Sequence, residues 1–146
     1  DVIIVPVGGG SGAAGTCTVV KRVAPGAQVI GVQAEKAPAA YLSWKEGRRV
    51  EARMETFAEG LATRAPFDLP QAILRRDLDD FVLVSEEEIA QGVRWMLEHT
   101  HNLAEGAGAA ALAAGVKLRD RLVGRRVVLI QSGGNLSMAR LKEIFT

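Results

Sequence analysis

The sequence predicts an α/β protein with an open, mainly parallel, twisted sheet and helices on both faces. Short apolar runs alternate with segments of helical character along the chain, which is the order of strand–helix–strand units. The first run, residues 2–7, is rich in β-branched residues and ends at a glycine cluster, as a strand buried on both faces does. A second unit of apolar run, glycines and helix lies near the other end, from residue 127 onward.

The individual elements follow from the same patterns. Apolar runs predict strands over residues 2–7, 28–33, 81–84 and 127–131. Stretches with few helix breakers predict helices over residues 16–23, 37–46, 85–99 and 106–121, and a short one after residue 135. Ser85 and Glu88 have the spacing of a capping box at a helix start. Residues 51–80 are interrupted by Gly60, Pro66 and Pro70 and are predicted as loops with short helical turns.

Length and composition limit the classes of function. The chain has 146 residues, the size of one domain, and a formal net charge of +1, which argues against nucleic acid or an anionic membrane as partner. No apolar run approaches the ~20 residues of a membrane span and no signal peptide is evident, so we expect a cytoplasmic protein. The single cysteine, Cys17, is predicted as a core residue. Because Asp1 is directly followed by a strand, we expect the chain to be part of a longer polypeptide.

The glycine cluster after the first strand predicts a phosphate site. It consists of Gly8, Gly9, Gly10, Ser11 and Gly12, four glycines in five residues, and a helix follows it. Glycines let the backbone approach an anion closely, and the first N–H groups of a helix have no partner within the helix. A tight strand-to-helix turn without a ligand is the structural alternative.

The same cluster also fits a dinucleotide-binding pattern. Gly10, Gly12 and Gly15 have the spacing G-x-G-x-x-G, and Glu35 lies twenty residues beyond Gly15, where an acid would bind a ribose. This pattern alone indicates an NAD(P)- or flavin-dependent oxidoreductase as a second function.

Four stretches together resemble one family. They are residues 5–12, 55–62, 82–89, and residues 105–109 with the Ser-Gly-Gly-Asn sequence at 132–135. In order and spacing they resemble the pyridoxal-phosphate (PLP) enzymes of the tryptophan-synthase fold (fold type II), and most of all the threonine/serine dehydratase and serine racemase branch. The resemblance covers nearly the whole chain. It implies that residues 1–146 are a single domain, the C-terminal part of the PLP-binding large domain.

The resemblance implies roles for particular residues. The glycine cluster would bind the cofactor phosphate through backbone N–H groups, although Ser11 and Gly12 depart from the family's usual fourth glycine and aliphatic residue. Ser132 would face the pyridine nitrogen, and Glu105 would lie near the ring. The structural alternatives are a turn residue for Ser132 and a solvated acid for Glu105.

The family's other catalytic parts are expected outside this chain. None of the lysines has the context of the lysine that bonds the cofactor, so no catalytic residue is predicted here; they are Lys21, Lys36, Lys45, Lys117 and Lys142. The upstream half, including the small domain, is likewise missing. Several relatives bind a divalent ion through a glutamate and an aspartate, and these positions are Gln33 and Ala39 here, so no metal is predicted. His99 and His101 are interpreted as helix C-terminal residues.

The resemblance therefore implies a function for the complete enzyme. With its N-terminal half, it would eliminate water from L-threonine or L-serine, a small amino-acid substrate, and yield a 2-oxo acid and ammonia. A homo-oligomer is expected for the full-length protein. The alternatives are the dinucleotide-dependent oxidoreductase and a catalytically inert α/β fragment that only binds an anion.

Overall fold

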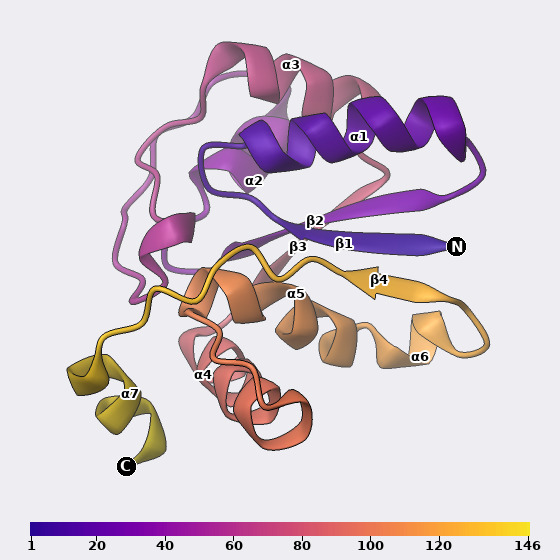
Figure 1. The fold of residues 1–146 in the computed structure, drawn as a ribbon. Helices are drawn as coiled ribbons and strands as arrows, with labels where there is room; N and C mark the ends of the chain where they lie inside the picture. Colours follow the sequence, from indigo (N-terminus) through magenta and orange to yellow (C-terminus); the bar gives the residue numbers. More distant parts are fainter.

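The computed structural model describes residues 1–146 and confirms the α/β class. Its sheet has four strands in the order β3-β2-β1-β4. The strands are β1 (Val2–Pro6), β2 (Gln28–Ala34), β3 (Asp80–Val84) and β4 (Val127–Leu129). Every neighbouring pair is parallel, so the carboxyl ends of all four strands lie at one edge of the sheet (Figure 1). The loops that carry the glycine motifs leave the sheet at this edge.

Helices cover both faces of the sheet (Figure 1). One face carries α1 (Ser11–Val23), α2 (Ala39–Glu46) and α3 (Asp68–Asp77). The other carries α4 (Glu86–Trp95), α5 (Gly106–Lys117) and α6 (Arg119–Leu122). The last helix, α7 (Met138–Phe145), packs against α4. No helix is long and apolar enough to cross a membrane.

The alternation of strand side chains produces two cores. Val5, Val7 and Val29 point toward α1 and α3, where Cys17 is also buried, as predicted. Burial, with a smaller contribution from Asp77, raises the pKa of the Cys17 thiol to about 11. On the opposite face, Ile4 and its neighbours pack against the alanine-rich α5, whose small side chains let the helix lie close to the sheet.

One prediction was wrong: residues 51–80 contain a regular ten-residue helix, α3. Pro66 precedes this helix and Pro70 lies in its first turn. A proline is tolerated there because the first N–H groups of a helix have no partner within the helix. The prolines that were interpreted as breakers therefore mark the start of a helix.

Other boundaries differ by a few residues. Helix α1 begins at Ser11, inside the glycine cluster, rather than at residue 16. The predicted helix over 106–121 is divided at Leu118 into α5 and α6. The capping box of Ser85 and Glu88 is formed, but the helix after it passes into a π-helical turn, Met96–Thr100, before residue 101.

Candidate functional site

The glycine cluster joins β1 to α1: Gly8, Gly9 and Gly10 form the loop, and Ser11 and Gly12 are the first residues of α1. Gly10 has a φ of 88°, a left-handed conformation that suits glycine, and it is the N-cap of α1. The backbone N–H groups of residues 8–13 make no hydrogen bond within the chain; the first one bonded in this segment is that of Ala14, which donates to the Gly10 oxygen at 2.8 Å. A run of unpaired N–H groups at a helix N-terminus is an anion-binding arrangement.

The glycine loop contacts the segment around a 3₁₀ turn, Glu59–Leu61. A Cβ atom on Gly8 would overlap the carbonyl oxygen of Gly60, so these two backbones are in direct contact. The Thr63 hydroxyl donates to the Gly8 oxygen at 3.3 Å. This packing fixes the start of the glycine loop by backbone contact.

The Ser-Gly-Gly-Asn segment lies between β4 and α7 and packs on the start of α5. The N–H of Glu105 donates to the Gly133 oxygen at 3.1 Å, and a Cβ atom on Gly133 would overlap the Glu105 carboxylate. A Cβ atom on Gly134 would lie 2.6 Å from the Leu103 oxygen, and one on Gly108 would overlap the Gly133 oxygen. The close approach of backbone oxygens requires glycine at positions 108 and 134, whereas Gly133 lies against the end of the Glu105 side chain.

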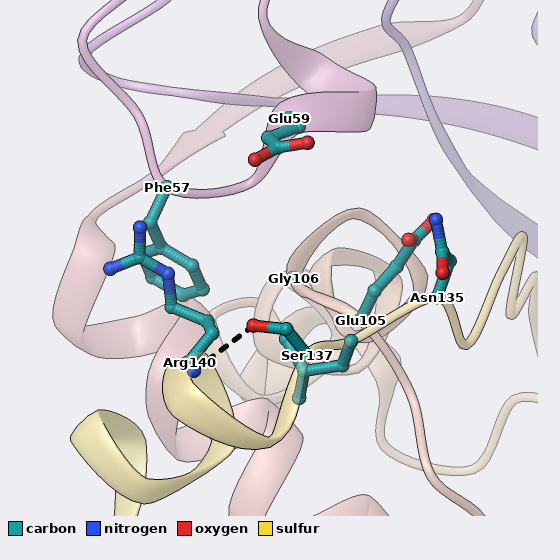
Figure 2. A pocket seen from close by; sticks show the side chains of 8 residues that line it. Phe57, Glu59, Glu105, Gly106, Asn135, Ser137 and Arg140 are labelled. Atoms are coloured by element: carbon teal, nitrogen blue, oxygen red, sulfur yellow. Dashed lines mark hydrogen bonds between the residues drawn. The ribbon is translucent and has the colours of Figure 1, made fainter.

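A cavity of about 300 Å³ lies beside Glu105 (Figure 2). It is lined by Phe57, Glu59, Glu105, Gly106, Asn135, Leu136, Ser137 and Arg140. The Arg140 guanidinium lies 5.8 Å from the centroid of the Phe57 ring. The backbone N–H of Arg140 donates to the Ser137 hydroxyl at 3.2 Å. Two carboxylates and one guanidinium make this a polar cavity.

The predicted site residues thus form one connected surface, although they do not share one cavity. Gly8 contacts Gly60, a Cβ atom on Gly60 would lie 3.8 Å from Glu105 Oε1, and Glu105 contacts Gly133. Ser132 is exposed next to Gly133 and its side chain makes no hydrogen bond within the chain. Neither Ser132 nor the glycine loop lines the cavity of Figure 2.

Sequence reasoning assigned no role to the residues that join the glycine loop to Glu105. Glu86, the first residue of α4, accepts a hydrogen bond from the Phe57 N–H at 2.8 Å and so holds the segment that leads to Gly60. Gly60 was interpreted as a breaker, whereas it lies between the glycine loop and α5. The sequence signal for this segment was the resemblance of residues 55–62 to a motif of the family.

Gln33, which occupies one of the two metal-binding positions of several relatives, has a structural role here. Gln33 is fully buried, and its Oε1 accepts hydrogen bonds from the N–H groups of Ala40 at 3.1 Å and Tyr41 at 3.0 Å, at the start of α2. Glu35 pairs with Lys117 at 3.5 Å. Gln33 therefore acts as a cap for α2, and a divalent ion would have to compete with a formed ion pair for Glu35.

Two of the five lysines form ion pairs at the surface. Lys21 lies 2.6 Å from the Asp79 carboxylate, and Lys117 lies 3.0 Å from Glu88 as well as near Glu35. Both side chains join secondary-structure elements through these pairs. His101 has a left-handed backbone, with a φ of 57°, directly after the π-helical turn, so it ends that helix as expected.

Comparisons with known proteins agree with the resemblance. Residues 1–133 match the family described as "Pyridoxal-phosphate dependent enzyme". The chain is 38% identical over 146 residues to an L-threonine ammonia-lyase of Thermotoga maritima, with 99% of this chain and 36% of that protein covered. The chain thus spans less than half the length of this curated relative.

Solved structures give the same result. The processed form of threonine deaminase isoform 2 from Solanum lycopersicum matches with a TM-score of 0.92 and 30% identity, over 98% of this chain and 43% of that one. Serine racemase from Dictyostelium discoideum matches with a TM-score of 0.87 and 31% identity, over 94% of this chain and 45% of the racemase chain. These findings favour the PLP family over the dinucleotide-binding alternative.

Proposed function

We propose that this chain, which belongs to the family of pyridoxal-phosphate-dependent enzymes, is part of a threonine/serine dehydratase. In this proposal residues 1–146 are the C-terminal part of the cofactor-binding domain, and the full-length enzyme converts L-threonine or L-serine to a 2-oxo acid and ammonia. The threonine ammonia-lyase relatives support threonine, and the serine racemase match supports a site that also accepts serine. A cytoplasmic, homo-oligomeric enzyme stays a prediction.

The free N–H groups of residues 8–13 carry this proposal. Phosphate is an anion with several acceptor oxygens, and a glycine loop at a helix N-terminus offers several donors to it without side chains in the way. The direct contact of Gly8 with Gly60 supports the loop in this shape. The residues present therefore fit the phosphate of PLP.

In the proposal, Ser132 and Glu105 would lie near the cofactor ring. Bound PLP supplies an electron sink for the loss of the α-proton and the β-hydroxyl of an amino acid. The Ser132 hydroxyl would donate a hydrogen bond to the ring nitrogen. Because a serine is neutral, it would favour an unprotonated nitrogen, whereas a carboxylate would favour a protonated one. Glu105, held over Gly133, would lie near the same ring.

A catalytically inert anion-binding unit is the second candidate for the isolated chain. The observation that favours it is that each lysine on the elements around the glycine loop has another environment: Lys21 pairs with Asp79, and Lys36 is exposed on the β2–α2 loop. The chain alone would then bind phosphate without performing chemistry.

Phosphate titration of the chain tests the binding site. Inorganic phosphate, added at constant ionic strength, is expected to shift the amide NMR signals of Gly8, Gly9, Gly10, Ser11 and Gly12. Chloride at the same ionic strength is the control and should leave them in place. Shifts confined to other parts of the chain would show that the glycine loop is only a turn.

Ser132 tests the role of the C-terminal motif in the full-length polypeptide. Ser132→Ala removes one hydrogen bond and is expected to weaken PLP binding by about 0.5–1.5 kcal/mol. Ser132→Asp should instead favour a protonated ring nitrogen and change the ratio of dehydration to racemisation. The measurements are the PLP dissociation constant and both product yields from L-threonine and L-serine.

Ser85→Ala is a suitable control for the Ser132 variants, because Ser85 caps α4 and lies outside the proposed site. It should lower stability without changing PLP affinity. Unchanged PLP affinity in Ser132→Ala, together with unchanged product ratios in cofactor-loaded Ser132→Asp, would leave Ser132 as a turn residue.

A further inference from the structure

An aromatic side chain, that of Phe67, lies against the glycine loop without belonging to either core of the sheet. Cε2 of Phe67 is 3.2 Å, and Cδ2 is 3.5 Å, from the position that a Cβ atom would take on Gly9. The edge of the ring therefore borders the residue whose N–H is one of the free donors of the loop. Phe67 comes from the start of α3, more than fifty residues further along the chain.

The backbone of Phe67 is held in place from both sides. It is the N-cap of α3, with an extended conformation, and its carbonyl oxygen accepts the Gln71 N–H at 3.0 Å. Pro66 precedes it, and Pro70, one turn into the helix, would lie 2.9 Å from a Cβ atom on Gly10. The start of α3 thus contacts two successive residues of the glycine loop, Gly9 through Phe67 and Gly10 through Pro70.

Core packing does not explain the position of this ring. Phe67 is 64% exposed, and neither core on the sheet includes it. Leu69, two residues further on, is 73% exposed but makes no comparable contact with a loop glycine. Because burial does not explain where this ring lies, its contact with the candidate anion site is the feature that needs an explanation.

We propose that Phe67 is a positioning residue that forms one wall of the phosphate site. The proposal rests on the proposed function, because it needs the phosphate of PLP to bind at residues 8–13. The rim of an aromatic ring carries partial positive charge, so an edge directed at the loop favours a nearby anion. The ring also covers one side of Gly9, where it would limit the access of water to the hydrogen bonds between N–H groups and a bound phosphate.

The test compares phosphate affinity in three variants of the chain. Phe67→Ala removes the ring, Phe67→Tyr keeps its edge, and Leu69→Ala is a matched loss of an exposed apolar side chain from the same turn. Dissociation constants for inorganic phosphate come from the shifts of the Gly9 and Gly10 amide signals at constant ionic strength. Thermal unfolding without phosphate is measured for each variant.

Phe67→Ala is expected to raise the dissociation constant about three- to tenfold, which corresponds to the usual energy of one aromatic contact. Phe67→Tyr should restore affinity to near that of the wild-type chain, and Leu69→Ala should not change it. The thermal midpoint of Phe67→Ala should stay close to the wild-type value because the ring is mostly exposed. A purely structural role would lower this midpoint and would leave the affinity of the folded protein unchanged.

The possible failures are distinguishable. If phosphate does not shift the glycine-loop amides of the wild-type chain, the proposed function is wrong and the wall has no ligand. If the wild-type chain binds phosphate there and Phe67→Ala binds it equally well, only the role of Phe67 is wrong. An equal loss in Phe67→Ala and Leu69→Ala would also overturn it, since the effect would not depend on contact with Gly9.

Discussion

At the scale of residues, two glycines near the start of α1 differ in what surrounds them. A Cβ atom on Gly8 would overlap the Gly60 oxygen, whereas one on Gly15 would meet no atom within 4 Å. We expect Gly8→Ala to lower the free energy of unfolding by about 1–3 kcal/mol, because the backbone must shift to relieve the overlap. It should also weaken phosphate binding, since the same shift moves the free N–H groups.

Gly15→Ala is the control in the same segment, and urea denaturation is the measurement. Gly15 is exposed within α1, so alanine there should raise the free energy of unfolding by up to about 1 kcal/mol. If Gly8→Ala were as stable as Gly15→Ala, the contact between the glycine loop and Gly60 would not support the loop.

Residue chemistry was predictable where a motif is local. The glycine cluster before α1 and the capping box of Ser85 are recognisable because each is complete within a few residues of sequence. Gly60, Glu86 and Phe67 were missed because their partners lie on distant segments, which only the fold brings together. The role of Gln33 was not predictable either, because a glutamine at the end of a strand carries no signal that it will cap the following helix.

At the scale of elements, the prediction was best for the strands and poorest between residues 51 and 80. An apolar run flanked by glycine has few interpretations, and all four predicted strands form. Helix α3 was missed because Pro66 and Pro70 were interpreted as breakers, although they mark its start. This helix nevertheless supports the glycine loop at Gly9 and Gly10, which makes it the most consequential omission.

At the scale of the whole molecule, alternating elements predicted the layers but not the strand order. The order β3-β2-β1-β4 places β1 in the interior of the sheet and puts its glycine loop beside the segment that follows β4. Both motifs leave the carboxyl edge of neighbouring strands, although they are more than a hundred residues apart in sequence. This adjacency, which the sequence does not show, is what the proposed function requires for the glycine loop and the Ser132 segment to bind one ligand.

The two halves of the candidate site should differ in local stability. Strands β1 and β2 are each paired on both sides and are largely buried. Strand β4 has three residues and pairs only with β1, with Val128 52% and Leu129 37% exposed. Helix α7 buries a single side chain, that of Ile144. Little apolar burial therefore holds residues 127–146 in place, so this part should open at lower cost than the central strands.

Amide hydrogen exchange followed by NMR can measure this difference. We expect the free energy of opening to be at least about 2 kcal/mol lower for amides in β4 and α7 than for those in β1 and β2, because local opening spares the core. The Glu105 N–H reports on the site itself: it donates to the Gly133 oxygen, so it should exchange with the C-terminal segment rather than with α5. Protection of Glu105 equal to that of the interior of α5 would instead mean that the Ser132 segment is fixed to the site before any ligand binds.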